Sequence, residues 1–300
     1  MAGMCREMSF PILGLEAGPG HSDPMGATEA DIVRTAARVE GETASYLTVR
    51  QDGPVVLLLH GTYWSRVWLP VLGSLARAGL RPIAVDFPGT GRSGGELALE
   101  TATVPALAEW TTRFVSVLEV SGPIAVVGHD IGGAVAQHLL ARELMPIPRL
   151  ALVNSVMYDS WPSPHVARLL RVAATGEEFL TARRKALTTD LAGAATEQRI
   201  AEYLDPWTDP RVRRSWLAMA GAAASRYTLD LVPRLRRSAT PKLLIWGEDD
   251  RFEKVEYAEK FALEIPRTTL VRIPGASHIP TENAPDRIGR ALADFLGSQC

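Results

Sequence analysis

The sequence lacks the features that mark secreted, membrane-spanning and metal-binding proteins. Only two cysteines occur in its 300 residues, Cys5 and Cys300, at opposite ends of the chain. A disulfide framework needs more cysteines at regular spacing, and neither neighbourhood resembles a metal site, so the composition fits a reducing compartment. No Lys/Arg-led apolar segment of signal-peptide type opens the chain, and no apolar run approaches the roughly 20 residues that span a bilayer. We therefore expect a cytoplasmic protein without a membrane partner.

An excess of charge of one sign is also missing. Lys and Arg number 32 against 34 Asp and Glu, a formal net charge of -2, so nothing attracts the chain broadly to phosphate backbones. The pieces Arg211–Arg214 and Arg234–Arg237 lack the interleaved aromatics of nucleic-acid sites and are more typical of a solvated face or a contact to an anionic substrate. We expect a small-molecule substrate, apolar or aromatic in character, and no nucleic-acid partner. Whether the chain forms a homodimer stays open.

Short apolar runs, each about the length of one strand, recur along the chain. They are apolar at consecutive positions, which is expected where both faces of a parallel sheet are covered by helices. The predicted strands are Val55–Leu59, Ile83–Val85, Ile124–Val127, Leu150–Val153, Leu243–Trp246 and Thr269–Ile273. Helical patterns lie between them, at Leu69–Ala78, Val104–Leu118, Gly132–Leu144, Tyr257–Leu263 and Ile288–Phe295. The alternation predicts an α/β fold with a mostly parallel, doubly wound sheet.

The alternation stops between about residues 157 and 233, where only helical patterns occur. These are Val166–Val172, Glu177–Leu187 and Val212–Ala224. An insertion at the carboxyl ends of the strands would lie over the ligand crevice, so we interpret 157–233 as a helical cap. The core would then comprise 31–156 and 234–300, while the prolines and glycines of residues 1–30 indicate a loose amino-terminal arm.

One predicted strand leads directly into a sharp turn and a helix. The sequence there is Gly128-His129-Asp130-Ile131-Gly132, a G-x-D-x-G pattern. In the nucleophile elbow G-x-S-x-G, the glycines permit a tight turn and close packing of strand and helix, which thrusts the central side chain out above the sheet. The alternative is that Asp130 simply caps the helix that follows.

An acid and a histidine follow two later strands. One strand ends in Gly247-Glu248-Asp249-Asp250, and the next in Pro274-Gly275-Ala276-Ser277-His278. Each group alone has an ordinary explanation as a turn residue, but the chain order of nucleophile, acid and histidine is that of a catalytic triad. Asp130, an acid and His278 are therefore predicted to meet above the sheet.

These motifs resemble those of the α/β-hydrolase superfamily. His60-Gly61 after the first strand and the turn Asp86–Ser93 after the second are similar as well, and the resemblance covers about residues 45–297. In this family the acid lies three residues after the glycine that ends its strand, which implies Asp250. The family also implies an oxyanion hole made by the backbone N–H groups of Thr62 and Ile131. His60 and the 86–93 turn are expected to be structural.

The aspartate at the nucleophile position resembles the branch that contains epoxide hydrolases and haloalkane or haloacetate dehalogenases. A carboxylate is already anionic at neutral pH and suits displacement at an sp³ carbon, with an alkyl ester of Asp130 as the product. His278, oriented by Asp250, would then activate water to hydrolyse that ester. No metal or organic cofactor is required.

Departures from the family patterns bear on the leaving group. Haloalkane dehalogenases often have tryptophan after the nucleophile and asparagine after His-Gly, where this chain has Ile131 and Thr62. Haloacetate dehalogenases tend to have arginines after the nucleophile, where this chain has Ile131 and Ala134. We therefore expect an epoxide hydrolase. A dehalogenase is the first alternative, and a non-hydrolytic relative, such as a cyclase, a lyase or a binding protein, is the second.

Epoxide hydrolases hold the opening oxygen with acidic hydroxyls, usually from cap tyrosines. Tyr227, near the return from the cap to the sheet, is the favoured donor. The other candidate substrate-binding residues are Tyr158, Trp161, Tyr63, Trp64 and Tyr203. For each of them, ordinary packing within the cap is the alternative.

Overall fold

The protein folds around one eight-stranded sheet. The structure is a computed structural model and describes residues 32–118, 120, 122–162 and 176–297. The strands are β1 (Ile32–Val39), β2 (Glu42–Val49), β3 (Val55–Leu59), β4 (Arg81–Val85), β5 (Ala125–Asp130), β6 (Leu150–Ser155), β7 (Lys242–Gly247) and β8 (Thr268–Ile273). Their order across the sheet is β1-β2-β4-β3-β5-β6-β7-β8. β1 and β2 pair antiparallel with their neighbours, and all the other pairs are parallel.

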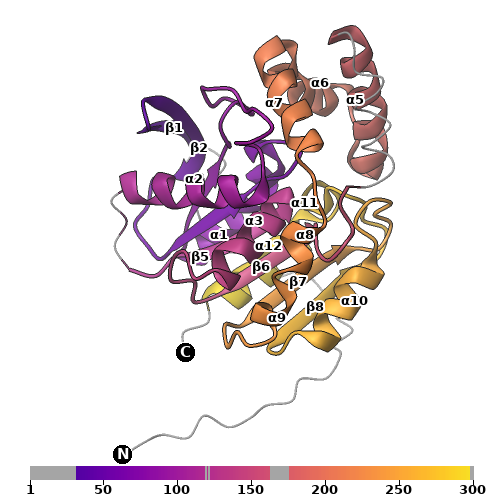
Figure 1. The fold of residues 1–300 in the computed structure, drawn as a ribbon. Coiled ribbons are helices and arrows are strands. Elements are labelled where there is room, and N and C mark those ends of the chain that lie inside the picture. The colour runs from indigo at the N-terminus through magenta and orange to yellow at the C-terminus, as the bar shows by residue number, and fades with distance from the viewer. Residues whose placement is uncertain (1–31, 119, 121, 163–175, 298–300) are drawn as a thin grey trace, which may run out of the picture.

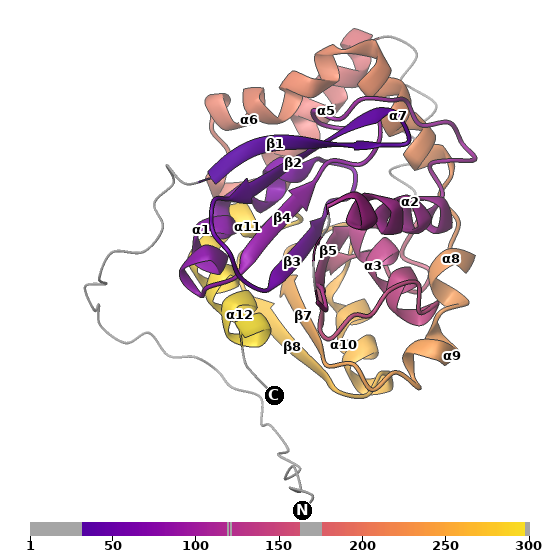
Figure 2. The same cartoon turned by 90° about the vertical axis from the view of Figure 1, so that its left-hand side faces the viewer.

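Helices cover both faces of the sheet. The helices of the sheet layer are α1 (Leu69–Arg77), α2 (Val104–Val117), α3 (Ile131–Ala141), α10 (Val255–Glu264), α11 (Pro280–Asn283) and α12 (Pro285–Gly297), with the 3₁₀ turn η2 (Ser65–Trp68) before α1. α1 and α12 pack together on one face, and α2 and α3 pack together on the other (Figure 2). The predicted mostly parallel, doubly wound α/β sheet is confirmed.

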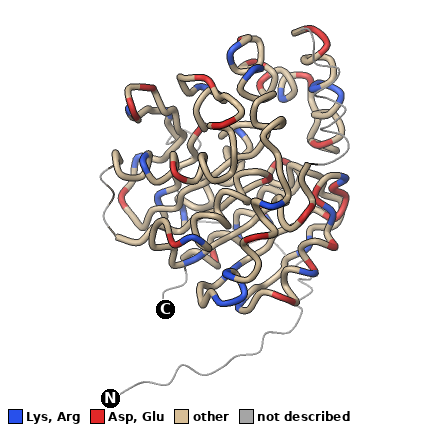
Figure 3. The backbone as a smooth tube through the Cα atoms, viewed as in Figure 1, with Lys and Arg blue, Asp and Glu red and all other residues tan. Residues whose placement is uncertain are grey.

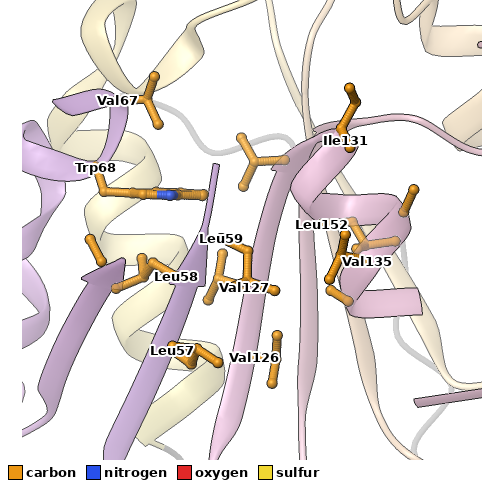
Figure 4. Packing of buried hydrophobic residues seen from close by; sticks show 14 of the residues in the cluster. Leu57, Leu58, Leu59, Val67, Trp68, Val126, Val127, Ile131, Val135 and Leu152 are labelled. Carbon is orange, nitrogen blue, oxygen red and sulfur yellow. The ribbon is translucent and has the colours of Figure 1, made fainter. Parts of the chain in front are cut away.

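The core of the molecule lies where β3 and β5 run side by side. The Val55–Leu59 strand has the bounds that its apolar run predicts, and all five of its residues are buried. Figure 4 shows Leu57, Leu58 and Leu59 beside Val126 and Val127 of β5, with Trp68 and Val135 on opposite sides of the two strands. These central strands are parallel, so their carboxyl ends lie at the same edge of the sheet.

The two amino-terminal strands are absent from the prediction. β1 has mostly polar or half-exposed residues, Arg34, Thr35 and Arg38 among them, because it lies at the edge of the sheet and pairs only with β2. A search for continuous apolar runs misses such a strand, since one face and one edge of it contact solvent.

Between β6 and β7 every regular element that the structure describes is a helix, and residues 156–162 form an irregular turn directly after β6. These helices are α5 (Gly176–Asp190), η3 (Ala192–Ala194), α6 (Glu197–Leu204), η4 (Asp205–Thr208), α7 (Pro210–Gly221), α8 (Arg226–Leu229) and α9 (Val232–Leu235). α5, α6 and α7 stand together apart from the sheet, at the top of Figure 1. α8 and α9 instead pack on α3 of the sheet layer. The predicted helix Val166–Val172 and the arm 1–30 lie outside the described residues, and the domain boundaries stay a prediction.

Charged residues of both signs are spread along the chain in the view of Figure 3. Acidic and basic residues alternate along the tube of Figure 3, including the helices above the sheet. Within the described part of the chain, no helix is both long and apolar enough to cross a membrane.

Candidate active site

Asp130 occupies a strained turn between β5 and α3. Its backbone has φ 53° and ψ -125°, outside the regions that L-residues prefer, and the pairing of β5 with β6 shifts register between His129 and Asp130. Strain of this kind persists only where the surroundings enforce it, and it is concentrated at functional sites. The turn lifts the Asp130 side chain above the carboxyl edge of the sheet.

Two glycines make room for this turn. A Cβ atom at Gly132 would lie 2.4 Å from the carbonyl oxygens of both Leu59 and His60, so only glycine lets α3 begin this close to β3. A Cβ atom at Gly61 would lie 2.3 Å from Asp130 Oδ2. The glycines of the G-x-D-x-G pattern and of the His-Gly pair therefore allow the loop after β3 to lie close to the turn after β5.

Asp130 does not cap the helix that it precedes. Its side chain makes no capping hydrogen bond to α3. Instead, Oδ2 accepts hydrogen bonds from the backbone N–H and from the hydroxyl of Thr62, both at 2.8 Å. The capping alternative therefore fails. The Thr62 N–H that the family resemblance implies therefore donates to the carboxylate, and the Thr62 hydroxyl is a second donor that the motif did not indicate. Among the described residues, no hydrogen bond joins the Ile131 N–H to this carboxylate.

His278 lies between the two carboxylates. Its Nδ1 is 2.8 Å from Asp250 Oδ2, and its Nε2 is 3.8 Å from Asp130 Oδ2. The Nε2 distance exceeds a hydrogen bond, which leaves this nitrogen available to a reacting group. Asp250 Oδ1 accepts the backbone N–H groups of Phe252 and Glu253 at 2.8 and 3.2 Å, which fixes the carboxylate. The structure thus brings together all three predicted triad residues.

Two residues that hold this arrangement escaped the sequence reasoning. Asn154, at the end of β6, donates to Asp250 Oδ2 at 2.7 Å and accepts the Gly247 N–H at 2.8 Å. His129 Nε2 donates to the backbone carbonyl of His278 at 2.7 Å. Burial, reinforced by the charge of His278, lowers the pKa of His129 to about 4, so it is a neutral donor at pH 7. The only signal for either residue is its position next to a strand end.

The charges of the site stabilise one another. Burial opposes ionisation of Asp130, but the adjacent His278 and the hydrogen bond from Thr62 outweigh it and lower the pKa of the carboxyl to about 2. Burial likewise lowers the pKa of His278, and the charges of Asp250 and Asp130 outweigh it, so the pKa lies well above its ordinary value. The electrostatics of the site therefore favour an anionic Asp130 and the protonated form of His278.

A small pocket lies over Asp130. The sheet layer contributes Thr62, Tyr63, Asp130, Phe252, Glu253 and His278 to its walls. The segment between β6 and β7 contributes Trp161, Arg183, Asp190 and Trp216. The space between these side chains is about 20 Å³, room for roughly one water molecule, so a substrate of several atoms enters only if side chains move.

Only two of the six predicted substrate-binding aromatics, Tyr63 and Trp161, line this pocket, and the Tyr63 hydroxyl donates to Asp190 at 2.5 Å. The structure places Tyr158, Tyr203, Tyr227 and Trp64 outside it because each has other partners. The Tyr158 hydroxyl donates to Glu264 at 3.3 Å, and that of Tyr203 donates to Glu282 at 3.0 Å. The Tyr227 hydroxyl accepts from Arg226, and the Trp64 ring packs under Arg34 and Arg92.

The turn after β4 has a structural role. Asp86 is buried and accepts hydrogen bonds from the backbone N–H groups of Ser65 and Arg92. His60 Nε2 accepts the Phe87 N–H at 3.0 Å, so its proton resides on Nδ1, next to the Gly61 carbonyl. Both residues fasten the loops around the elbow and lie outside the pocket. Among the described residues, no group of three or more His, Cys, Asp or Glu side chains could hold a metal ion.

Comparison with known proteins places this geometry in context. The model of the alpha/beta hydrolase family matches residues 56–291. A haloalkane dehalogenase of Bradyrhizobium diazoefficiens is 28% identical over 301 aligned positions, which cover 87% of this chain and 93% of the relative. The magnesium-chelatase 30 kDa subunit of Rhodobacter capsulatus is 30% identical over 274 positions, covering 82% and 87%. The solved structure of an alpha/beta hydrolase fold protein from Burkholderia ambifaria superposes with a TM-score of 0.76 at 24% identity, over 90% of this chain and 99% of the other.

Proposed function

This chain belongs to the alpha/beta hydrolase family, and we propose that it is a hydrolase that uses Asp130 as a covalent nucleophile toward an sp³ carbon. The observation that carries the proposal is the placement of the Asp130 carboxylate. It lies in the pocket, makes no capping bond, and has a pKa lowered to about 2, so it is ionised at any physiological pH. A carboxylate that is already anionic needs no base to attack carbon.

In the first step, an oxygen of Asp130 attacks the substrate carbon, the new C–O bond forms, and the leaving group departs with the electron pair of the broken bond. Oδ2 already holds both hydrogen bonds from Thr62, so Oδ1 is the oxygen assigned to the attack. Oδ2 then becomes the carbonyl oxygen of the ester. The Thr62 donors remain on it and stabilise the negative charge that develops there in the second step.

In the second step, His278 acts as the general base. Esterification removes the negative charge of Asp130, which is one of the charges that hold the pKa of His278 high. His278 can then release its proton to solvent and accept one from a water molecule through Nε2, while Asp250 stabilises the imidazolium that forms. The resulting hydroxide attacks the carboxyl carbon and the C–O bond to the alkyl group's oxygen breaks. The alkoxide takes up the remaining proton of that water and leaves as the alcohol, which restores the Asp130 carboxylate.

Loss of halide is the leaving-group chemistry that we favour. Haloalkane dehalogenases are among the relatives, and the cap tyrosine hydroxyls on which epoxide opening would depend have other partners. A halide leaves without a proton and needs only donors or cations nearby. Trp216 lines the pocket, and its buried indole N–H has no acceptor among the described residues, so it can hold a departing halide.

Epoxide opening is the second candidate, and Glu253 favours it. This side chain lines the pocket and is 1% exposed, and neither carboxyl oxygen makes a hydrogen bond of good geometry in the described part of the chain. Burial raises the pKa of Glu253 well above its usual value, because together with the charges of Asp130 and Asp250 it outweighs the opposing effect of the nearby Ser160 hydroxyl. A neutral carboxylic acid can donate its proton to the oxygen of an opening epoxide ring.

The helices α5 and α7 are proposed to act as a cap over this chemistry. They supply Arg183, Asp190 and Trp216 to the pocket, while the sheet layer supplies the triad. A cap of this kind excludes bulk water from the ester and sets the size and polarity of the substrate.

The test is to trap the intermediate. The His278→Gln protein is mixed with small haloalkanes and epoxides, and its intact mass is recorded. Removal of the base should stall the second step and leave the first, so the ester accumulates on Asp130. A haloalkane adds only its alkyl group because the halide has left, whereas an epoxide adds its whole mass.

The matched control is the Asp130→Asn, His278→Gln double variant, checked for deamidation, which should gain no mass. An alkyl adduct that maps to Asp130 supports the dehalogenase, and a whole-epoxide adduct supports the second candidate. Absence of any adduct from a broad panel, with turnover also absent in the wild type, would contradict the nucleophile role and favour a non-hydrolytic relative of the fold.

A further inference from the structure

The pocket contains a buried arginine that the proposed chemistry does not use. Arg183, on α5, lines the pocket opposite the triad and is only 4% exposed. Its guanidinium carbon lies over the rings of Tyr63, Trp207 and Trp216 at 4.9, 4.9 and 5.0 Å. The ring faces hold the cation in place, but they offer no lone pair to its N–H bonds.

One edge of this guanidinium has no partner. Nε and Nη2 are both buried, and neither has a hydrogen-bond acceptor among the described residues. No carboxylate of the described chain lies within ion-pair distance of Arg183 either, since the nearby Asp190 accepts from Tyr63 and pairs with Arg251 at 3.2 Å. Buried charged donors without partners are rare in native proteins because their desolvation is uncompensated, and a bound anion is one partner that would satisfy both nitrogens.

The two unpartnered nitrogens are the pair that binds a carboxylate best. Nε–H and the Nη2–H on the same side of the guanidinium point in parallel, at the spacing of the two oxygens of a carboxylate. The rings on its faces restrict the orientation of this fork. The geometry is therefore preorganised for a planar anion that approaches edge-on, and not for a spherical one.

We infer that the substrate is a small organic acid whose carboxylate is bound by the Nε and Nη2 edge of Arg183. The inference rests on the proposed function, because the same pocket must present the reacting carbon of that acid to Asp130. It replaces the apolar or aromatic substrate expected from the sequence. Because the pocket has only about 20 Å³ of free space, fewer side chains must move to admit a short acid than a long alkyl chain.

The binding test uses Asp130→Asn protein, which cannot turn substrate over, with propanoate and its neutral analogue 1-propanol as the probes. Tryptophan fluorescence is the readout, because Trp207 and Trp216 contact the guanidinium. We expect saturable binding of propanoate, roughly 10- to 100-fold weaker after Arg183→Met. Arg184→Met is the matched control, since Arg184 is the next residue on α5, is half-exposed and pairs with Glu197 at 2.7 Å. It should leave propanoate binding unchanged.

A second variant keeps the test decisive if Arg183→Met does not fold. Arg183→Lys retains the charge but has no paired edge, so it should also weaken propanoate binding relative to Arg184→Lys. Equal binding of propanoate and 1-propanol, or propanoate binding unchanged in Arg183→Lys, would overturn the inference.

The chemical test compares 2-bromopropanoate with 1-bromopropane in the His278→Gln protein. We expect faster adduct formation from the acid, with the advantage lost in Arg183→Lys. An adduct from 1-bromopropane without preference for the acid would leave the proposed function standing and refute the role of Arg183. Arg183-dependent binding of propanoate without any adduct would support the role of Arg183 and contradict the proposed function.

Discussion

The proposed mechanism depends on a proton switch at His278, and the Asp130→Asn variant tests it directly. His278 Nε2 lies 3.8 Å from Asp130 Oδ2, and both side chains are buried. Two unit charges about 4 Å apart attract by about 4 kcal/mol at an effective dielectric constant of about 20. Asparagine keeps the shape of aspartate and removes its charge, as esterification does. Proton binding to His278 should therefore weaken by up to about 4 kcal/mol.

The direction of this effect follows from the contributions to the pKa. Burial lowers the pKa of His278, and the charges of Asp250 and Asp130 raise it well above its ordinary value. Removing one of the two charges leaves burial less opposed, so the pKa of His278 falls. In the working enzyme, the same fall would convert a protonated His278 into a base only after the ester has formed.

The assay is an NMR titration of the histidine Cε1–H signals in wild-type and Asp130→Asn protein. The chain has six histidines, and the His278→Gln spectrum identifies the signal of interest. His138 serves as the internal control, because burial and the charge of Arg142 lower its pKa to about 4 without a contribution from Asp130. The free energy of proton binding to His278 should differ between wild type and Asp130→Asn. A difference of less than about 1 kcal/mol would refute the switch, because the charge of Asp130 would then be screened from the imidazole.

Two further substitutions test the residues around the triad. Asn154→Leu removes hydrogen bonds to Asp250 and to the Gly247 N–H, so chemical denaturation should show a free energy of unfolding lower by about 2–4 kcal/mol. Rapid kinetics should show that hydrolysis of the ester is slowed more than its formation. Glu253→Gln should not change stability at pH 4, but should raise it increasingly above pH 4.5, because a carboxyl whose pKa is raised in the folded state costs stability as pH rises. Unfolding curves at pH 4 and 8 check this sign, and the same variant should lose epoxide opening if Glu253 is the proton donor.

Local sequence patterns are enough to predict the parts of this protein that follow from strand burial and backbone sterics. Apolar runs such as Val55–Leu59 predict central strands because a parallel sheet buries both faces of each strand. The glycines around Asp130 predict the elbow because no side chain fits between β5, α3 and β3. The chain order of nucleophile, acid and histidine predicts the triad because parallel strands place their carboxyl ends at one edge.

The other side chains that reach this edge of the sheet come from distant parts of the chain and become visible in the folded protein alone. Thr62 and Asp130 are 68 positions apart, and Asn154 is 96 positions from Asp250, yet each pair is joined by a direct hydrogen bond. The predicted tyrosine Tyr227 lies outside the pocket, whereas Arg183, which no motif indicated, lines it. A short motif such as G-x-D-x-G determines the local backbone conformation, because its glycines at fixed spacing relieve specific steric clashes. The orientation of a side chain above the sheet depends instead on its contacts with aromatic and acidic residues from distant segments. Those contacts result from tertiary packing, which a local sequence pattern does not encode.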